Sequence, residues 1–287
     1  MRKHRFNSTT SALKLSILIG LFCLTSLTAQ TANAAKEVAL TAAEQKWVEQ
    51  HPQVLLGGES DWPPFDFVNK EGIYSGIASD YLTLISQKTG LNFSLSIDKW
   101  SNLLDKIKAR EIDVLGAAYF TEERQQFVNF SSPYLNVLDY FFIRDDLNVT
   151  TLESLNGKRL AIPDGYANIG RLKKHFPNIK IITVSSFDEA IDAVIENRAD
   201  MLFDAYPTVS YALKSLAINS IIPFKSARKL GTSPLHIITR KDAPELASII
   251  EKGLAAITEE EKRTIYNRWV TSPPNSKQKL VQLTVAE

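Results

Sequence analysis

The stretch DVLGAAYFTEERQQFVNFSSPY, residues 113–134, contains the features that decide the fold. Its first part is apolar and is typical of a buried strand, while its last part is aromatic and ends at a proline turn. Arg124 lies in the short polar break between the two, three residues after Thr121. The stretch therefore predicts an arginine just beyond the end of a buried strand.

Arg124 allows two interpretations. Beside Glu122 and Glu123 it could form an exposed ion pair, which contributes little to stability. Its planar guanidinium also matches a carboxylate through two parallel hydrogen bonds, and this pairing is strong in a desolvated cleft. In that case Thr121 could offer its hydroxyl and backbone N–H to the same anion. The residue types by themselves leave both interpretations open.

Strands and helices alternate on both sides of this stretch. Before it, we expect helices at 40–52, 77–90 and 100–112, strands at 53–60 and 91–97, and a loop with a hairpin near 70–72. After it, we expect strands at 138–146, 158–165, 179–184, 200–205 and 234–239, and helices at 167–177, 186–199, 207–216, 242–258 and 259–270. Thr41 and Glu44 have the spacing of a capping box. Such alternation predicts an α/β protein with two lobes built on parallel sheets.

Ligands of open α/β sheets bind beyond the carboxyl ends of the strands. Four segments occupy such positions here, and we expect them to meet in a cleft between the lobes: GGESDW, AAYFTEER, IPDGYAN and FDAYP, which begin at residues 57, 117, 162 and 203. Their aromatic side chains could form the walls of a small pocket. Ordinary core packing is the alternative, and we favour it for Phe65 and Phe67.

Acidic side chains near this cleft could bind a ligand ammonium group. Glu59, Asp61, Asp164 and Asp204 are the candidates, and the alternative for each is a helix cap or a solvated turn. His51, His175 and His236 have no metal-ligand spacing, and no nucleophile elbow, phosphate loop or zinc pattern occurs. We therefore expect binding without catalysis, cofactor or metal. The formal net charge of +1 predicts no nucleic-acid partner.

The first 34 residues have the pattern of a secretory signal peptide. A basic start is followed by an apolar run at 13–29 and by small residues at 32 and 34. Cys23, the single cysteine, could mark a lipoprotein, but the bulky Phe22 before it argues against lipidation. No later stretch is long and apolar enough to span a bilayer. We expect a periplasmic chain without disulfides.

The motifs around these residues resemble the bacterial extracellular solute-binding proteins of family 3, the periplasmic amino-acid-binding type. The likeness covers residues 54–269 and is most specific in the block T-E-x-R-x-x-x-V-x-F-S-x-P-Y. The segments LTAAEQKWVEQHP, DWPPF and GIASDYL look closer to the Venus-flytrap sensor domains of BvgS-like histidine kinases. The resemblance implies two lobes joined by two hinge strands. It places the signal peptide at 1–34, lobe one at 38–139 and 236–271, lobe two at 140–235, and a flexible tail at 272–287.

The resemblance also implies roles for individual residues. In the family, the arginine of the T-E-x-R block binds the α-carboxylate of the ligand and falls on Arg124, and the threonine of that block falls on Thr121. The aromatic residue before PPF, which packs on the ligand, falls on Trp62. Donors after the DG turn fall on residues 166–168. We therefore expect the ligand-binding residues to be Arg124, Thr121, Trp62, Tyr119, Glu59, Ala117, Tyr166, Asn168 and Asp204.

Three departures from the family pattern concern the rest of the site. Small polar residues usually precede the threonine, whereas Ala117, Ala118 and Tyr119 stand here. The amine-binding aspartate is replaced by Ala205, and Asp204 lies one position early, where a regular strand would turn it the other way. The helical acid of the family is Ala78. The carboxylate half of the site looks intact, and the amine half does not.

The expected function is capture of a small carboxylate-bearing ligand, such as an amino acid, by a monomeric periplasmic solute-binding protein that delivers it to an ABC-type permease. One alternative is a ligand-sensing module that acts in trans on a membrane signalling protein. A second is an enzyme resembling cyclohexadienyl dehydratases, with Glu59 or Asp164 as the acid.

Overall fold

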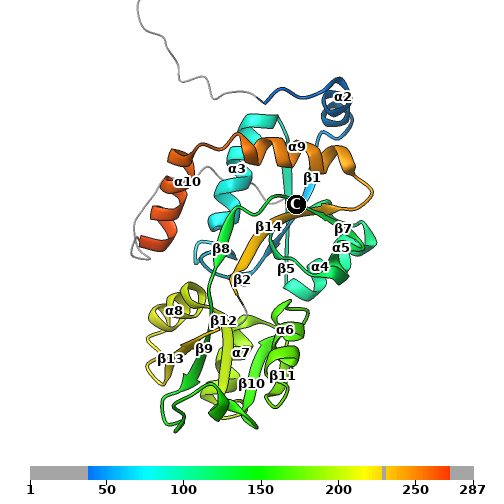
Figure 1. The fold of residues 1–287 in the computed structure, drawn as a ribbon. Coiled ribbons are helices and arrows are strands. Elements are labelled where there is room, and N and C mark those ends of the chain that lie inside the picture. Colours follow the sequence, from blue (N-terminus) through cyan, green and yellow to red (C-terminus); the bar gives the residue numbers. More distant parts are fainter. Residues whose placement is uncertain (1–37, 228–230, 272–287) are drawn as a thin grey trace, which may run out of the picture. The chain divides into compact units, whose positions relative to one another are not determined.

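The computed structural model describes residues 38–227 and 231–271 (Figure 1). The predicted signal peptide, Cys23 and the predicted tail at 272–287 lie outside the described residues. Two large sheets dominate the described part, each with helices packed against it (Figure 1). We call the first sheet with its helices lobe 1, and the second sheet with its helices lobe 2.

Lobe 1 is built on a sheet with the strand order β5-β1-β6-β14-β7, to which β8 is added through β14. Its strands are β1 (Val54–Glu59), β5 (Phe93–Asp98), β6 (Val114–Tyr119), β7 (Val128–Phe130), β8 (Leu135–Val137) and β14 (Ser233–Arg240). β1 pairs in parallel with β5 and β6, and β14 runs antiparallel to β6. The carboxyl ends of three parallel strands therefore lie at one edge.

The helices of lobe 1 are α2 (Ala42–Gln50), α3 (Ile77–Thr89), α4 (Trp100–Ala109), α5 (Glu122–Gln125), α9 (Pro244–Ala255) and α10 (Glu259–Tyr266), followed by a π-helical turn at Asn267–Thr271. The predicted capping box is confirmed, because Thr41 accepts from the Glu44 amide and Glu44 accepts from the Thr41 amide. Glu44 also pairs with Lys252 at 2.6 Å, which ties α2 to α9.

Lobe 2 is built on a sheet with the order β11-β10-β12-β9-β13. Its strands are β9 (Asp139–Arg144), β10 (Arg159–Pro163), β11 (Lys180–Val184), β12 (Met201–Ala205) and β13 (Ile221–Ser226). Its helices are α6 (Asn168–His175), α7 (Phe187–Ile195), α8 (Tyr206–Ser215) and a 3-10 turn at Glu153–Leu155. β10, β11 and β12 are parallel, and β9 is antiparallel to β12.

The sequence did not predict β13. This strand lies at the edge of its sheet, contains Pro223 and exposes half of its residues, so it lacks the apolar alternation of a buried strand. A small sheet of β2 (Asp61–Trp62), β3 (Asp66–Val68) and β4 (Tyr74–Ser75) replaces the loop expected at 61–76. It buries Trp62 and Phe65 against lobe 1.

Two segments connect the lobes, one between β8 and β9 and one between β13 and β14. β14 returns to the first sheet at Ser233, where it pairs with β8. Only the second segment contains residues outside the described part of the chain, 228–230. The exact domain boundaries stay a prediction.

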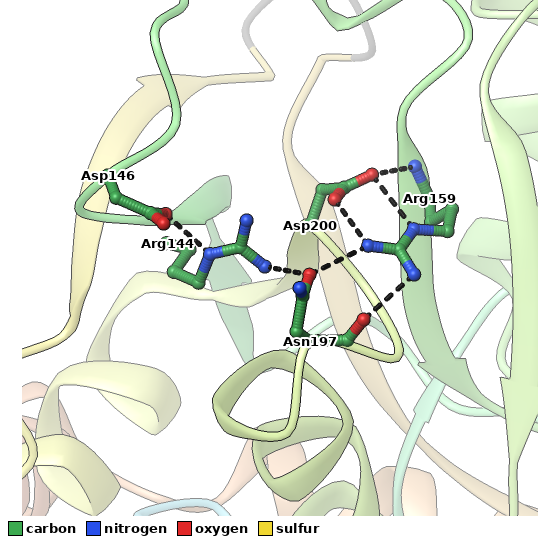
Figure 2. A network of polar contacts seen from close by, with 5 residues as sticks. All are labelled: Arg144, Asp146, Arg159, Asn197 and Asp200. Carbon is green, nitrogen blue, oxygen red and sulfur yellow. Dashed lines mark hydrogen bonds and ion pairs between the residues drawn. The ribbon is translucent and has the colours of Figure 1, made fainter.

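A polar network holds the amino ends of β10 and β12 together in lobe 2 (Figure 2). Arg159 binds both oxygens of Asp200, at 3.2 and 2.7 Å, and also contacts Asn197. Arg144, at the end of β9, contacts the same Asn197 and Asp146 (Figure 2). Because the network is at the amino ends of parallel strands, it lies opposite the predicted site and serves the fold.

Candidate functional site

The carboxyl ends of β1, β6 and β10 and the loops after them surround a cavity of about 20 Å³ at the junction of the lobes. Its lining consists of Glu59, Trp62, Trp100, Ala117, Ala118, Tyr119, Arg124, Tyr166 and Ala167. Six of the nine predicted ligand-binding residues are among them, and Thr121, Asn168 and Asp204 are not. The structure thus brings most of the predicted residues together, and their role in ligand binding stays a prediction.

Arg124 lies buried at this junction, with 5% of its surface exposed. Its Nη1 donates to the carbonyl of Tyr119 at 2.7 Å in lobe 1, and its Nη2 donates to the carbonyl of Gly165 at 2.8 Å in lobe 2. The guanidinium carbon lies 4.9 Å from the ring centre of Trp100. Among the described residues it has no ion-pair partner, so the surface ion pair with a neighbouring glutamate is wrong.

Arg124 stays charged near neutral pH although its environment lowers its pKa. Burial lowers the pKa of the guanidinium to about 10, while the charges of Glu123 and Glu59 act in the opposite direction. The side chain of Arg124 contacts two carbonyls and an aromatic ring, but no carboxylate of the described residues lies within ion-pair distance. A buried guanidinium binds an anion more strongly than a neutral carbonyl, so this site favours an anionic ligand.

Thr121 does not reach the cavity. Its hydroxyl accepts a hydrogen bond from the Arg124 amide at 3.1 Å and forms the N-cap of α5. Ser, Thr, Asp and Asn side chains at a helix start satisfy free backbone amides. The Thr121 oxygen is used in this way, while its O–H remains a donor, so its predicted contact with an anion stays a prediction. Thr121 acts by orienting the short helix from which Arg124 projects.

Glu59 ends β1 and has 3% of its surface exposed. Its Oε1 accepts a hydrogen bond from the hydroxyl of Tyr166 at 3.2 Å, which joins lobe 1 to lobe 2. Burial raises the pKa of Glu59 well above its usual range, and the charges of Asp61, Asp66 and Asp204 raise it further. The carboxyl is therefore in an environment that favours its protonated form.

Trp62 and Asp204 form a second contact between the lobes. The indole Nε1 donates to Asp204 Oδ1 at 3.1 Å, and the amide of Ala205 donates to the same oxygen at 2.6 Å. Asp204 Oδ2 is buried and has no hydrogen-bond partner among the described residues. Burial raises the pKa of Asp204 to about 7.

The expected orientation of Asp204 needs correction. Strict alternation along a strand would turn it away from the cleft, but β12 ends at Ala205 and the carboxylate reaches the opposite lobe. Ala205, at the position of the family's amine-binding aspartate, packs into the apolar cluster of lobe 1. Asp204 therefore supplies an acid at the junction from the position directly before Ala205.

Asn168 belongs to a network that sequence reasoning missed. Asp139, the first residue of β9, accepts from Tyr119 at 3.3 Å and from Ser233 of β14 at 2.5 Å, and Arg171 lies 3.6 Å from it. Asn168 accepts from Arg171 at 2.8 Å. The network joins the two segments that connect the lobes. An aspartate inside the apolar run VLDYFFI was the signal that could have revealed it.

Trp100 is the other residue that the sequence did not single out. It begins α4, and its indole Nε1 donates to the carbonyl of Gly165 at 3.2 Å. Gly165 therefore accepts from both Trp100 and Arg124 of lobe 1. A tryptophan at the start of a predicted helix, three residues after a predicted strand, was the available signal.

Protein side chains fill the part of the junction around Arg124. A volume of about 20 Å³ holds on the order of one water molecule, whereas pockets for small ligands have about 300–1,000 Å³. Besides the contacts above, Asp61 accepts from the Phe187 amide at 3.1 Å, and Lys99 donates to Ser185 at 3.2 Å. An amino acid could enter only if the lobes separate or Trp62 moves.

Within the described ranges, no group of three or more His, Cys, Asp or Glu side chains is arranged to hold a metal ion. In the same part of the chain, none of the helices combines the length and the apolar character that crossing a membrane requires.

Two lobes joined by two connecting segments, with strand ends that meet at the junction, define a two-lobed binding domain of the Venus-flytrap type. The chain belongs to the bacterial extracellular solute-binding proteins, family 3, whose sequence profile matches residues 54–272.

Comparison with individual proteins agrees with this class. The chain is 28% identical over 233 residues to the virulence sensor protein BvgS of Bordetella pertussis, which covers 80% of this chain and 19% of that protein. It therefore spans about a fifth of the length of this relative. The crystal structure of the periplasmic VFT2 domain of B. pertussis BvgS has a TM-score of 0.73 at 27% identity, over 81% of this chain and 100% of that one.

A transport-type relative is more distant. The putative ABC transporter arginine-binding protein 2 of Escherichia coli is 23% identical over 220 residues, which cover 75% of this chain and 90% of that protein. These two relatives are thus a sensor protein and a putative binding protein of a transporter.

Proposed function

We propose that this protein is a periplasmic ligand-sensing module. It takes up a small carboxylate-bearing ligand between its lobes, and the resulting lobe position is read by a membrane signalling protein. The main sequence expectation, delivery to a permease, becomes the second candidate because the sensor BvgS is the more similar relative.

The observation that carries the proposal is the position of Arg124. Its two donated hydrogen bonds end on carbonyls of different lobes, Tyr119 in lobe 1 and Gly165 in lobe 2. A ligand carboxylate could replace both carbonyls, because a guanidinium binds a carboxylate through two parallel bonds. Exchange of the Gly165 contact for a ligand contact would link ligand binding directly to the position of lobe 2.

The acids at the junction complement this cation. Glu59 and Asp204 are buried and have no cationic partner among the described residues, so each could accept a ligand ammonium group. A carboxylate on Arg124 and an ammonium on these acids would together select a zwitterion such as an amino acid.

The second candidate is transport, in which a permease recognises the same ligand-bound form. It is favoured by the arginine-binding relative, most of whose length this chain covers. The two functions share one binding site and differ in the membrane partner. Deletion of the gene would abolish ligand uptake in the transport case and ligand-dependent gene expression in the sensor case.

The enzyme alternative would use Glu59 as its acid, because Asp164 is exposed at the surface. We retain binding without turnover as the proposal. Incubation of the purified protein with prephenate, followed by ultraviolet absorbance of the aromatic product, separates the two.

A thermal-shift screen of amino acids and small organic acids tests the proposed site, since a ligand selective for the folded form raises its melting temperature. Arg124→Ala should abolish the shift, and Arg124→Lys should weaken it because the planar fork is lost. Arg198→Ala is the matched control, as this arginine is about half exposed on lobe 2 and pairs with Glu196. An unchanged shift in Arg124→Ala would refute the assignment.

A further inference from the structure

The junction of the lobes contains more buried acid than buried base. Glu59, Asp66 and Asp204 are at most 3% exposed, and within the described residues none of them has a Lys, Arg or His nitrogen within 4.0 Å. The cations named at the junction have other partners. Arg124 binds two carbonyls, Arg171 lies 3.6 Å from Asp139, and the exposed Lys99 donates to Ser185 at 3.2 Å and acts on Asp61.

Acids and hydroxyl groups on several elements act on Asp204 or are acted on by it. The titratable groups that influence it or are influenced by it are Asp61 of β2, Glu59 of β1, Tyr119 of β6, Asp139 of β9 and Tyr166 before α6. Its one donor from the opposite lobe is the neutral indole of Trp62. Its Oδ2 has no partner in the described structure. A charge on this carboxyl would therefore be uncompensated.

Glu59 is in a similar position. Asp61, Asp66 and Asp204 surround it, together with the hydroxyls of Tyr166 and Tyr74. Arg124 is the cation whose charge it influences, but the two are not in ion-pair contact. The donor to Glu59 comes from Tyr166 of lobe 2, just as the side-chain donor to Asp204 comes from Trp62 of lobe 1.

Both carboxyls are thus covered by the opposite lobe, and separation of the lobes would return them to water. An uncompensated carboxylate is stable in water and costly when buried, so lobe contact and ionisation oppose each other. We propose that Glu59 and Asp204 form a proton-operated latch, which holds the lobes together in mild acid and releases them as the pH rises. This inference rests on the proposed function, because it describes the regulation of the same site.

The direction and range follow from the two groups. Burial raises the pKa of Asp204 from 3.8 to about 7, although the hydrogen bonds from Ala205 and Trp62 act in the opposite direction. Burial also raises the pKa of Glu59 well above 4.5, although the hydrogen bond from Tyr166 lowers it. Protonation therefore favours lobe contact. For Asp204 this preference is complete below pH 3.8 and is lost between there and pH 7. Each group lowers the ratio of joined to separated lobes up to about tenfold per pH unit within its range.

Double electron–electron resonance measures the lobe separation directly. Nitroxide labels would be placed on Asp105→Cys in α4 and Lys173→Cys in α6, two exposed positions on different lobes, in a chain with Cys23→Ser. We expect one short distance at pH 5 and a growing population of longer distances up to pH 8.5. Asp204→Asn and Glu59→Gln, neutral mimics of the protonated acids, should keep the short distance at higher pH.

Asp192→Asn is the matched control, because Asp192 is an exposed acid of lobe 2, and it should behave as the wild-type protein. A wild-type distance that does not change from pH 5 to 8.5 would overturn the proposal without any variant. An opening that persists unchanged in both Asp204→Asn and Glu59→Gln, with circular dichroism confirming that they fold, would overturn it too.

The experiment separates this inference from the proposed function. If the latch fails while an amino acid still shifts the melting temperature through Arg124, only the inference is wrong. If the distance between the labels changes with pH but no carboxylate ligand binds, the inference about Glu59 and Asp204 is supported and the ligand-binding proposal is wrong.

Discussion

The contact between Trp62 and Asp204 gives the sharpest test of how the lobes meet. Trp62→Phe removes the indole N–H and part of a ring that packs 4.8 Å from Phe65 and 5.6 Å from Tyr119, centre to centre. Asp204→Ala removes the acceptor. Each substitution alone changes several contacts, so only the double-mutant cycle isolates the pair.

The coupling free energy follows from the hydrogen bonds. Asp204 Oδ1 accepts from Trp62 at 3.1 Å and also from the Ala205 amide at 2.6 Å, so loss of the indole does not leave this oxygen without a donor. The pair should therefore contribute the net value of one buried hydrogen bond, about 1 kcal/mol. The single substitution Trp62→Phe should cost about 1–3 kcal/mol, because packing is lost as well.

Urea unfolding at pH 5.5, followed by far-ultraviolet circular dichroism, measures both quantities. The matched control is Trp269→Phe with Asp80→Ala, in which an indole Nε1 donates to a carboxylate at 2.8 Å entirely within lobe 1. We expect both cycles to show coupling. If the control pair couples and the Trp62–Asp204 pair does not, the lobes do not meet in solution as the structure shows.

Two further predictions concern the stability of lobe 1. Burial acts to raise the pKa of Glu44, but hydrogen bonds from Lys252 and other donors outweigh it and lower this pKa to about 2. Glu44→Gln should therefore lower the free energy of unfolding by about 1–2 kcal/mol at pH 7. Its effect should fade as the pH drops from 4.5 through 2, as urea titrations at several pH values would reveal. Gly76→Ala should cost about 2–4 kcal/mol, since a Cβ there would lie 2.4 Å from the Phe65 carbonyl oxygen at φ 125°. Gly170→Ala is the control, because an added Cβ there would meet open space, and the free energy of unfolding should stay unchanged in the same urea assay. An equal loss of stability in both variants would contradict the steric explanation for Gly76.

Local patterns predicted most of the architecture correctly. Apolar runs such as 113–120 become buried strands, and amphipathic segments become the helices that cover them. The errors occur where a strand is partly exposed or very short. β13 lies exposed at a sheet edge, and β2, which contains Trp62, has only two residues. A pattern of a few residues has no period long enough to distinguish a strand from a loop.

The candidate site shows the same division. Arg124, Glu59, Trp62 and Tyr166 were predictable because each lies at or shortly after the end of a strand, where parallel sheets place their sites. Asp139 and Trp100 were not, because their importance arises from partners far away in the sequence, Ser233 and Gly165.

The order of apolar and polar residues along the chain was sufficient to define two α/β lobes and an arginine at their junction, since secondary structure depends on neighbours a few positions apart. Only the tertiary structure decided what surrounds that arginine. It placed carbonyls of both lobes on the guanidinium and buried Glu59 and Asp204 at the same junction, with no cation in ion-pair contact with them among the described residues. Burial and charge at the junction depend on segments more than a hundred residues apart, and no local pattern contains that information.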